Sequence, residues 1–197
     1  KFVYAGSTSI YGIPEQYPTP ESAPADPRYP YALSKWLAEE AVMHWGRVFQ
    51  LPVISLRITS AYGTGMARSS RYGIYGSVIK TLMSQKHHKL PYTIVGDGTQ
   101  SRDFVHVSYV VEAFIRAAES NVTGAALNIG SGKPRTINEL VSLLGDGPVA
   151  HIPKRPGEPD ITWADIRWAR QMLNWAPQMA LEEGIAQMLA RPEEWVD

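Results

Sequence analysis

The chain has 197 residues and a formal net charge of zero, and 44% of its residues are hydrophobic while 19% are charged. This balance is typical of a globular protein and excludes the basic surface that nucleic acid or an anionic membrane demands of a partner. Cysteine is absent, which excludes disulfide scaffolds, thiolate metal sites and cysteine nucleophiles. With no apolar run of about 20 residues and no signal peptide, the sequence predicts a cytoplasmic protein with neither nucleic acid nor membrane as a partner.

The first elements predict a strand, a loop, a helix and a strand. Residues 2–5 form an apolar run that predicts a buried strand, and small residues follow it at once. Residues 13–30 are rich in proline and predict a loop. A helix is expected from Pro30 to Phe49, with proline in its first turn, and a second buried strand over residues 51–58. Strand, helix and strand in this order predict a parallel crossover unit, so the fold class is α/β.

The helix expected from Pro30 to Phe49 is apolar over more than one stripe. One set of residues follows a single face and a second set widens it, namely Leu33, Leu37, Ala41 and Val48, and then Ala32, Trp36, Val42, Trp45 and Phe49. One face can cover a sheet, while the other packs on a second helix or on a partner subunit. The pattern therefore predicts a homodimer formed through this helix.

The remainder of the chain alternates loops, helices and strands. After a loop rich in glycine and serine we expect helices over residues 77–84, 107–119, 137–144, 166–173 and 181–189, and strands over residues 92–95 and within "AALNIGSG" at 125–132. His87 and His88 have no carboxylate or third histidine at a suitable spacing. They predict a surface loop, and no metal site is expected.

Polar residues stand where the predicted strands end, which is where open parallel sheets bind ligands. Ser7 ends the first strand, Tyr31 opens the helix, and Ser60 follows the second strand. Lys35 lies four residues after Tyr31, on the same helix face, where its ammonium favours the phenolate and makes the phenol a usable base. With Ser7 bonded to a substrate hydroxyl, the three suit removal of a hydroxyl proton as a hydride leaves for a nicotinamide. The alternative is that Tyr31 packs its ring and Lys35 is a solvated helix residue.

Six blocks of sequence recur in the order and spacing of a known family. They are "FVYAGSTSIYG", "YPYALSK", "ISLRITSAYGTG", "IVGDGTQSRDFVHV", "ALNIGSGKPRTINEL" and "KRPGEPDITWADIRWARQMLNW". Together they resemble the NAD-dependent nucleotide-sugar epimerase/dehydratase family, a branch of the extended short-chain dehydrogenase/reductases, and its UDP-sugar 4-epimerases above all. The resemblance implies bound NAD and a nucleotide sugar, with a UDP-sugar as substrate, that is oxidised transiently to a 4-keto intermediate.

The resemblance also implies two interleaved domains. Residues 1–63 and 101–132 correspond to the C-terminal half of a Rossmann-type domain with a parallel sheet. Residues 64–100 and 133–197 correspond to a smaller α+β domain that binds the substrate.

Matched position by position, the family's catalytic residues are Ser7, Tyr31 and Lys35. Tyr31 corresponds to the catalytic base, Lys35 to its partner that also holds the nicotinamide ribose, and Ser7 to the residue that bonds the sugar hydroxyl. Ala5 and Gly6 match positions beside the cofactor.

Further matches predict how the substrate is bound. Thr8 and Ser60 fall at positions beside it, and Arg102 and Arg155 match arginines that grip its pyrophosphate, a role that suits the guanidinium fork. On the residues alone, the two arginines can equally form surface ion pairs, with Asp103 and Glu158.

Departures from the family pattern favour one reaction of the family over another, but they do not identify the sugar. Thr8 and Ser9 stand where the family's 4,6-dehydratases carry acidic residues, so that epimerisation is favoured over dehydration. Ser60 replaces an asparagine, and Ser108 and Tyr109 replace an acidic pair, which leaves the substrate undecided. A dehydratase or reductase of the same family remains an alternative, as does a non-catalytic nucleotide-sugar binding or dimerisation module.

The family's Gly-rich turn, which cradles the cofactor phosphates, lies upstream of the strand with which this chain begins. Gly63-Thr-Gly65 does not replace it, because Arg68 stands where a third glycine is required. We therefore expect the chain to be the C-terminal part of a longer enzyme, and these 197 residues by themselves to bind NAD weakly.

Overall fold

The computed structural model describes residues 1–63, 65, 77–154 and 157–192. In chain order the elements are β1 (Phe2–Ser7), the 3-10 turn η1 (Thr8–Tyr11), α1 (Pro30–Phe49), β2 (Val53–Ile58), β3 (Ser60–Tyr62), α3 (Val78–His87), β4 (Tyr92–Val95), β5 (Ser101–Arg102), β6 (Phe104–His106), α4 (Val107–Glu119), β7 (Ala125–Ile129), β8 (Arg135–Thr136), α5 (Ile137–Leu144), β9 (Val149–Ile152), α6 (Arg167–Leu173) and α7 (Leu181–Leu189). None of the described helices is both long and apolar enough to span a bilayer.

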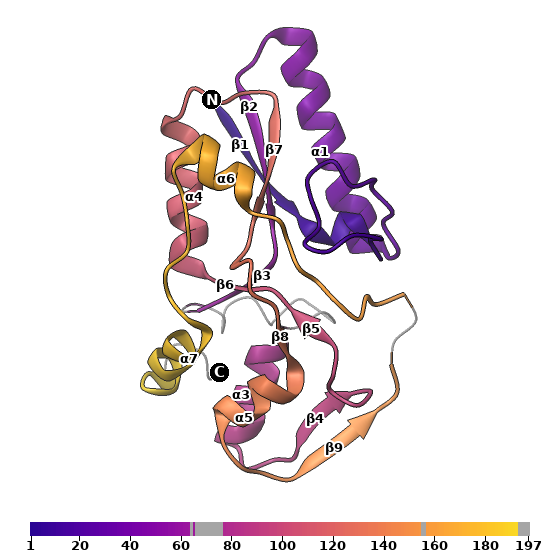
Figure 1. The fold of residues 1–197 in the computed structure, drawn as a ribbon, viewed down its shortest axis with the longest axis vertical. Coiled ribbons are helices and arrows are strands. Elements are labelled where there is room, and N and C mark those ends of the chain that lie inside the picture. Colours follow the sequence, from indigo (N-terminus) through magenta and orange to yellow (C-terminus); the bar gives the residue numbers. More distant parts are fainter. Residues whose placement is uncertain (64, 66–76, 155–156, 193–197) are drawn as a thin grey trace.

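A parallel sheet in the order β1-β2-β7 lies at the centre of one half of the molecule (Figure 1). Phe2 of β1 is opposite Val53 of β2, and Ile54 of β2 is opposite Ala125 of β7. Helix α1 packs on one face of the sheet and α4 on the other. Side chains alternate between the faces of a strand, so Ile54 and Leu56 of β2 pack towards α4 in the same cluster as Val110. The parallel pairing of β1 and β2 across α1 confirms the predicted α/β fold.

Strand β1 is less buried than its apolar sequence predicts. Phe2 is 55% exposed, and Ala5 is also exposed. In the described part of the chain β1 is an edge strand with β2 as its neighbour. An edge strand has a neighbouring strand on one side only, so β1 is less covered than β2. The prediction of a buried strand is correct for the strand and wrong for its burial.

Helix α1 approaches the sheet closely through one narrow face. Its buried residues, Ala32, Glu39 and Gly46, recur every seven positions. A Cβ atom at Gly46 would meet the Val53 side chain, so the small residue allows the close approach. The broader apolar face lies open to solvent in this chain, through the exposed residues Leu33, Leu37, Trp45, Val48 and Phe49. Of the two faces predicted to be buried, only the narrow one is covered within the chain.

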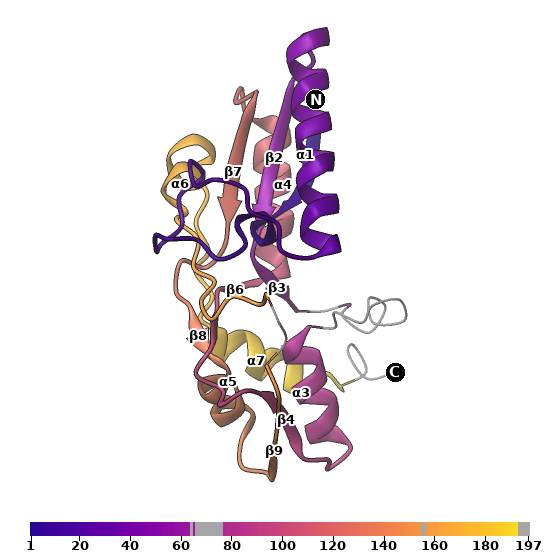
Figure 2. The same cartoon turned by 90° about the vertical axis from the view of Figure 1, so that its right-hand side faces the viewer.

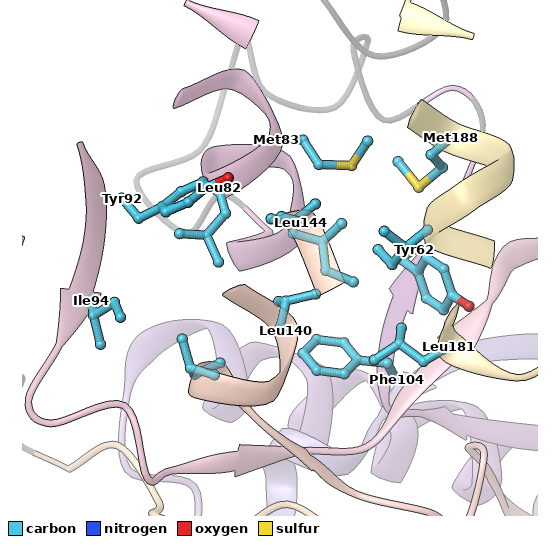
Figure 3. Packing of buried hydrophobic residues seen from close by; sticks show 13 residues of the cluster. Tyr62, Leu82, Met83, Tyr92, Ile94, Phe104, Leu140, Leu144, Leu181 and Met188 are labelled. Atoms are coloured by element: carbon cyan, nitrogen blue, oxygen red, sulfur yellow. The ribbon is translucent and has the colours of Figure 1, made fainter. Parts of the chain in front are cut away.

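The other half of the molecule has its own hydrophobic core, between α3, α5, α7 and the strands beside them (Figures 2 and 3). Tyr62 and Phe104 enter it from the short parallel strands β3 and β6. Leu82, Leu140 and Met188 enter from the three helices. Strands β4 and β9 form a parallel pair at the edge of this half.

The last third of the chain returns to the sheet before it ends in the second core. Ala169 and Leu173 of α6, with Trp175 beyond it, pack in the cluster that contains Ile54 and Leu127. Leu181 and Ile185 of α7 pack in the other cluster. The segment from Ala164 to Trp175 thus belongs to the sheet half by packing, although it is remote from the sheet in sequence.

The predicted helices all form, within three residues at each end. Helix α3 continues to His87, so His87 lies in its last turn and not in a surface loop as predicted. Strand β9 was not predicted, because "VAHI" is short and all four of its residues are exposed. Strands β5 and β8 have two residues each and pair antiparallel with each other. Such short strands depend on this pairing more than on their local sequence.

Candidate active site

The start of α1 presents Tyr31 and Lys35 at the carboxyl end of the sheet. Pro30 occupies the first turn, where its missing N–H costs no hydrogen bond, and Tyr29 precedes it in an extended conformation. Because α1 runs back antiparallel to the strands, its first turns lie where β1 and β2 end (Figure 1). The Tyr31 side chain is 45% exposed, and the Lys35 Nζ atom lies 5.8 Å from the centroid of its ring. The helical spacing therefore brings the two groups together.

Lys35 is also attached to the first strand. Its Nζ atom donates to the carbonyl oxygen of Ala5 at 3.0 Å and lies 5.6 Å from the centroid of the Tyr4 ring. The Tyr4 hydroxyl in turn donates to the Lys35 carbonyl at 3.2 Å. One hydrogen bond and a ring contact thus hold the ammonium beside β1, and the second hydrogen bond holds the Lys35 backbone there.

Ser7 and Thr8 lie where β1 turns into η1. The Ser7 Oγ atom accepts a hydrogen bond from the Ser9 backbone N–H at 3.2 Å and caps the turn. Thr8 Oγ1 donates to the Ile58 carbonyl at the end of β2, at 3.3 Å. Both hydroxyls are therefore fixed at the same edge of the sheet as the first turns of α1, with which η1 is in contact.

Arg102 approaches the site from the other half of the molecule. Its Nη1 atom donates to the carbonyl oxygens of Ser101 at 2.9 Å and Asp160 at 3.4 Å. Burial lowers the pKa of the guanidinium, while the charge of Glu158 acts in the opposite direction. Burial raises the pKa of Tyr29, and the charge of Arg102 opposes this as a smaller effect; the ring of Tyr29 stacks on that of Tyr31 at 6.5 Å. Arg102 thus acts electrostatically on a tyrosine in contact with Tyr31.

An ion pair between Arg102 and Asp103, one of the alternatives for this arginine, is not formed. The Asp103 carboxylate is buried and accepts hydrogen bonds from the N–H and hydroxyl of Ser131, both at 2.6 Å. Further bonds come from the N–H groups of Gly132 and Ala164, each at 3.2 Å. Asp103 lies between β5 and β6 and is fully buried, while Arg102, the last residue of β5, is half-buried.

For the remaining predicted site residues, the structure gives backbone contacts or burial, or does not describe the residue. Ser60 lies in β3 opposite Phe104, and its backbone N–H donates to the Asp103 carbonyl at 3.0 Å. Gly6 is buried beside α1. Arg155 falls outside the described residues. Among the residues that the structure describes, no cluster of His, Asp and Glu has the geometry of a metal site.

A group of polar residues that was not predicted from the sequence lies beneath the site. Glu39, Arg57 and Tyr11 are joined by hydrogen bonds although they come from a helix, a strand and a 3-10 turn. Two signals were present in the sequence. Arg57 interrupts the apolar run of β2, and Glu39 follows Lys35 by four residues on the face of α1 that was expected to be apolar. A charge at either place requires a buried partner.

The parallel sheet, the crossover helix and the polar groups at the carboxyl ends of the strands define a Rossmann-type α/β protein. The chain belongs to the NAD dependent epimerase/dehydratase family, whose model matches residues 1–130.

Among its relatives is the UDP-glucose 4-epimerase of Mycolicibacterium smegmatis, 33% identical over 184 residues, in an alignment that covers 90% of this chain and 57% of the relative. UDP-glucuronic acid decarboxylase 1 of Arabidopsis thaliana is 30% identical over 200 residues, covering 96% of this chain and 45% of the relative. The solved structure of MoeE5 in complex with UDP-glucose and NAD matches with a TM-score of 0.88 and 32% identity, over 99% of this chain and 65% of that one. The chain thus spans less than two thirds of the length of these proteins.

Proposed function

We propose that the protein is a nucleotide-sugar 4-epimerase that uses NAD and acts on a UDP-sugar. The observation that carries the proposal is that the helix of Tyr31 and Lys35 contacts the turn capped by Ser7 at the carboxyl end of the sheet, in a chain of the NAD dependent epimerase/dehydratase family. The relatives named for UDP-glucose epimerisation, and the match to a structure bound to UDP-glucose and NAD, support this substrate class.

The described residues fit the nicotinamide end of NAD. An ammonium has three donors, and the bond from Lys35 to Ala5 uses one of them, so Lys35 is suited to bind ribose hydroxyls. Ala5 and Gly6 border the same place. When bound, NAD would supply the acceptor for a hydride from the sugar carbon and the donor for its return. The Gly-rich turn for its phosphates has no counterpart within residues 1–197, and we assign it to the part of the relatives that this chain does not cover.

The chain's own residues transfer the proton and bind the substrate. Tyr31 takes the proton of the 4-hydroxyl group, and the Lys35 ammonium stabilises the phenolate that does so. Ser7 orients the same hydroxyl by a hydrogen bond. Arg102 binds the pyrophosphate, together with Arg155, while Thr8 and Ser60 line the substrate. The keto sugar then rotates, and return of the proton and hydride to the other face gives the 4-epimer.

The reaction is tested first by removing the Tyr31 hydroxyl in the full-length enzyme. We expect Tyr31→Phe to lower kcat by about a thousandfold or more while substrate still binds, because general base catalysis contributes roughly 10²–10⁴-fold. Turnover of UDP-glucose and binding by calorimetry give the two readouts. Glu112→Gln, which breaks the pair with Arg116 on α4, is the control and should keep kcat within about twofold. An unchanged rate in Tyr31→Phe would instead favour the non-catalytic binding module.

A second reaction of the same family is favoured by the similarity to UDP-glucuronic acid decarboxylases. It falls within the dehydratase or reductase alternative, in that the 4-keto intermediate goes on to a different product. Incubating the full-length enzyme with UDP-glucose, UDP-N-acetylglucosamine and UDP-glucuronic acid separates the two. The 4-epimers identify an epimerase, while deoxy-keto products or released CO₂ identify the alternative.

We also propose a homodimer formed by the exposed apolar face of α1. The five large apolar residues exposed on this helix would be covered by a second copy. The two-domain division predicted from the sequence stays a proposal, and the packing of α6 favours assigning that helix to the domain that holds the sheet. The cytoplasmic location stays a prediction.

A further inference from the structure

A chain of buried polar groups runs beneath the site, from α1 across the sheet. We call it the Arg57 network and define it as Glu39, Ser55, Arg57, Tyr11 and Asn128. Glu39 and Tyr11 are 2% and 3% exposed, while Ser55 and Asn128 are fully buried. The members lie up to 117 residues apart in sequence and are joined by hydrogen bonds of 2.6–3.2 Å.

One end of the network holds the helix that carries the proposed catalytic pair. Glu39 follows Tyr31 and Lys35 at intervals of four residues, so the three lie along one side of α1. The Glu39 carboxylate accepts from Ser55 Oγ at 2.6 Å and from Arg57 Nη2 at 2.6 Å. Arg57 Nε donates to the same carboxylate, at 3.1 and 3.2 Å. This paired geometry fixes both the height and the rotation of α1 above β2.

The other end of the network holds the turn that begins at Ser7. Arg57 Nη1 donates to the Tyr11 hydroxyl at 2.8 Å and to the Glu21 carbonyl at 2.9 Å. The Tyr11 hydroxyl then donates to Asn128 Oδ1 at 2.8 Å. Tyr11 is the last residue of η1, and Ser7 is its cap. One guanidinium is therefore bonded both to the helix of Tyr31 and Lys35 and to the turn of Ser7.

The protonation states agree with these hydrogen bonds. Burial raises the pKa of Tyr11 to about 12, so its hydroxyl keeps the proton that it donates to Asn128. Burial alone lowers the pKa of Arg57, but its hydrogen bonds to Glu39 and Tyr11 and the charge of Glu39 outweigh this and raise it overall. The network therefore joins a neutral phenol to a guanidinium that keeps its charge.

Stability by itself is a weak explanation for such a pair. Desolvating two charges offsets most of their attraction, and apolar residues of similar size often replace a buried pair without loss of stability. Apolar residues have no directional bonds, however, and could not fix α1 and η1 relative to each other. The pair is thus better explained by the geometry that it imposes.

We propose that Arg57 is a positioning residue that, through Glu39 and Tyr11, sets Tyr31 and Lys35 at their working distance from Ser7. The inference rests on the proposed function, because only a reaction shared by these groups makes their spacing matter. Arg57 acts through other residues and does not itself touch the substrate.

Kinetics of the full-length enzyme test the proposal through two mild substitutions, Tyr11→Phe and Glu39→Gln. Each keeps the size of the side chain: Tyr11→Phe removes the hydroxyl that Arg57 binds, and Glu39→Gln removes the charge that pairs with Arg57. We expect kcat, per mole of folded enzyme, to fall by about tenfold to a hundredfold with KM unchanged within about threefold, since a misplacement of roughly 1 Å costs about this much. Glu112→Gln is the matched control, because it breaks the pair with Arg116 on α4, and it should leave kcat within about twofold.

Amide hydrogen exchange gives a readout that does not depend on turnover. The N–H groups of Gly12 and Asp26 donate to the carbonyls of Ser9 and Ile10 in η1. In Tyr11→Phe we expect these two amides to exchange at least about tenfold faster, while the amides of α7 keep their rates.

The outcomes separate the two proposals. If Tyr11→Phe folds and kcat is unchanged within about twofold, the positioning role is overturned, whatever the exchange shows. If the unsubstituted enzyme converts no UDP-sugar, the proposed function fails, and the exchange rates alone decide the network: faster exchange at Gly12 and Asp26 supports it, and unchanged exchange overturns it.

Discussion

Gly6 is the residue at which β1 comes nearest to the charged side chains under α1. A Cβ atom there would lie 2.7 Å from Ser55 Oγ, 3.0 Å from the Leu56 carbonyl oxygen and 3.1 Å from Glu39 Oε2. Glycine is required by this lack of space, independently of the cofactor role that the family resemblance implies. The role beside the cofactor stays a prediction, while the packing gives Gly6 a reason of its own.

Gly6→Ala should therefore destabilise the protein by about 1–3 kcal/mol, the usual cost of forcing an extra methyl group into a packed site. The free energy of unfolding in urea, measured without cofactor, checks this. Ala5→Ser, at the neighbouring exposed position, is the control and should change the free energy by less than about 0.5 kcal/mol. Equal stability of Gly6→Ala and the parent protein would show that β1 can move away from α1.

At the scale of single elements, helix α1 has more apolar surface than the rest of the chain covers. It is apolar on two faces, yet only the face with Ala32, Glu39 and Gly46 is buried. An amphipathic helix needs one covered face, so the second apolar face indicates a partner for Leu37 and Trp45.

Leu37→Glu should shift the proposed homodimer to monomer, because it places a charge in the centre of the apolar face. Light scattering during size-exclusion chromatography at micromolar concentration measures the change in mass. Trp168→Glu makes the same kind of change at an exposed residue of α6 and should leave the mass unaltered. A monomeric parent protein would remove the dimer proposal.

Helix α5 illustrates an element whose start is determined by local bonds. The Thr136 hydroxyl accepts from the Glu139 N–H at 3.1 Å, and the Glu139 carboxylate accepts from the Thr136 N–H at 2.7 Å. These reciprocal bonds form a capping box, and the bonds that Thr136 donates to the carboxylate lower the pKa of Glu139.

Loss of this cap in Thr136→Ala should cost about 1 kcal/mol of stability, in the range typical of threonine caps. Urea unfolding measures the loss. Ser142→Ala, in the middle of the same helix, removes a hydroxyl that only bonds back to the Asn138 carbonyl, and should change stability by less than about 0.5 kcal/mol. If both variants lose the same amount, the cap adds nothing beyond a surface hydroxyl.

At the scale of the whole molecule, two cores are built from interleaved segments of the chain. The sheet core takes Ile54, Leu127 and Trp175, while the second core takes Tyr62, Leu140 and Ile185. The chain thus crosses between the cores several times. Asp103 lies at one of these crossings, where it bonds the loop after β7 and the segment that leads to α6. These crossings couple the second core to the sheet at several points along the chain.

The sequence by itself determined what depends on near neighbours. Helix limits follow from apolar periodicity and proline, and the contact of Lys35 with Tyr31 follows from a spacing of four residues on one helix. The position of both at the carboxyl end of the sheet follows from the order strand, helix, strand. The family also follows from motifs that can be read along the chain.

Only the tertiary structure decided which distant groups meet. Arg57 is 18 residues from Glu39 and 46 from Tyr11, and nothing local in the sequence states that these three share one hydrogen-bond network. Likewise, the sequence left Asp103 as a possible ion-pair partner of Arg102, but in the structure the Asp103 carboxylate accepts a hydrogen bond from Ser131. The physical reason is that a buried charge requires a partner but does not specify which one, and the packing of the sheet against α1 and η1 makes that choice.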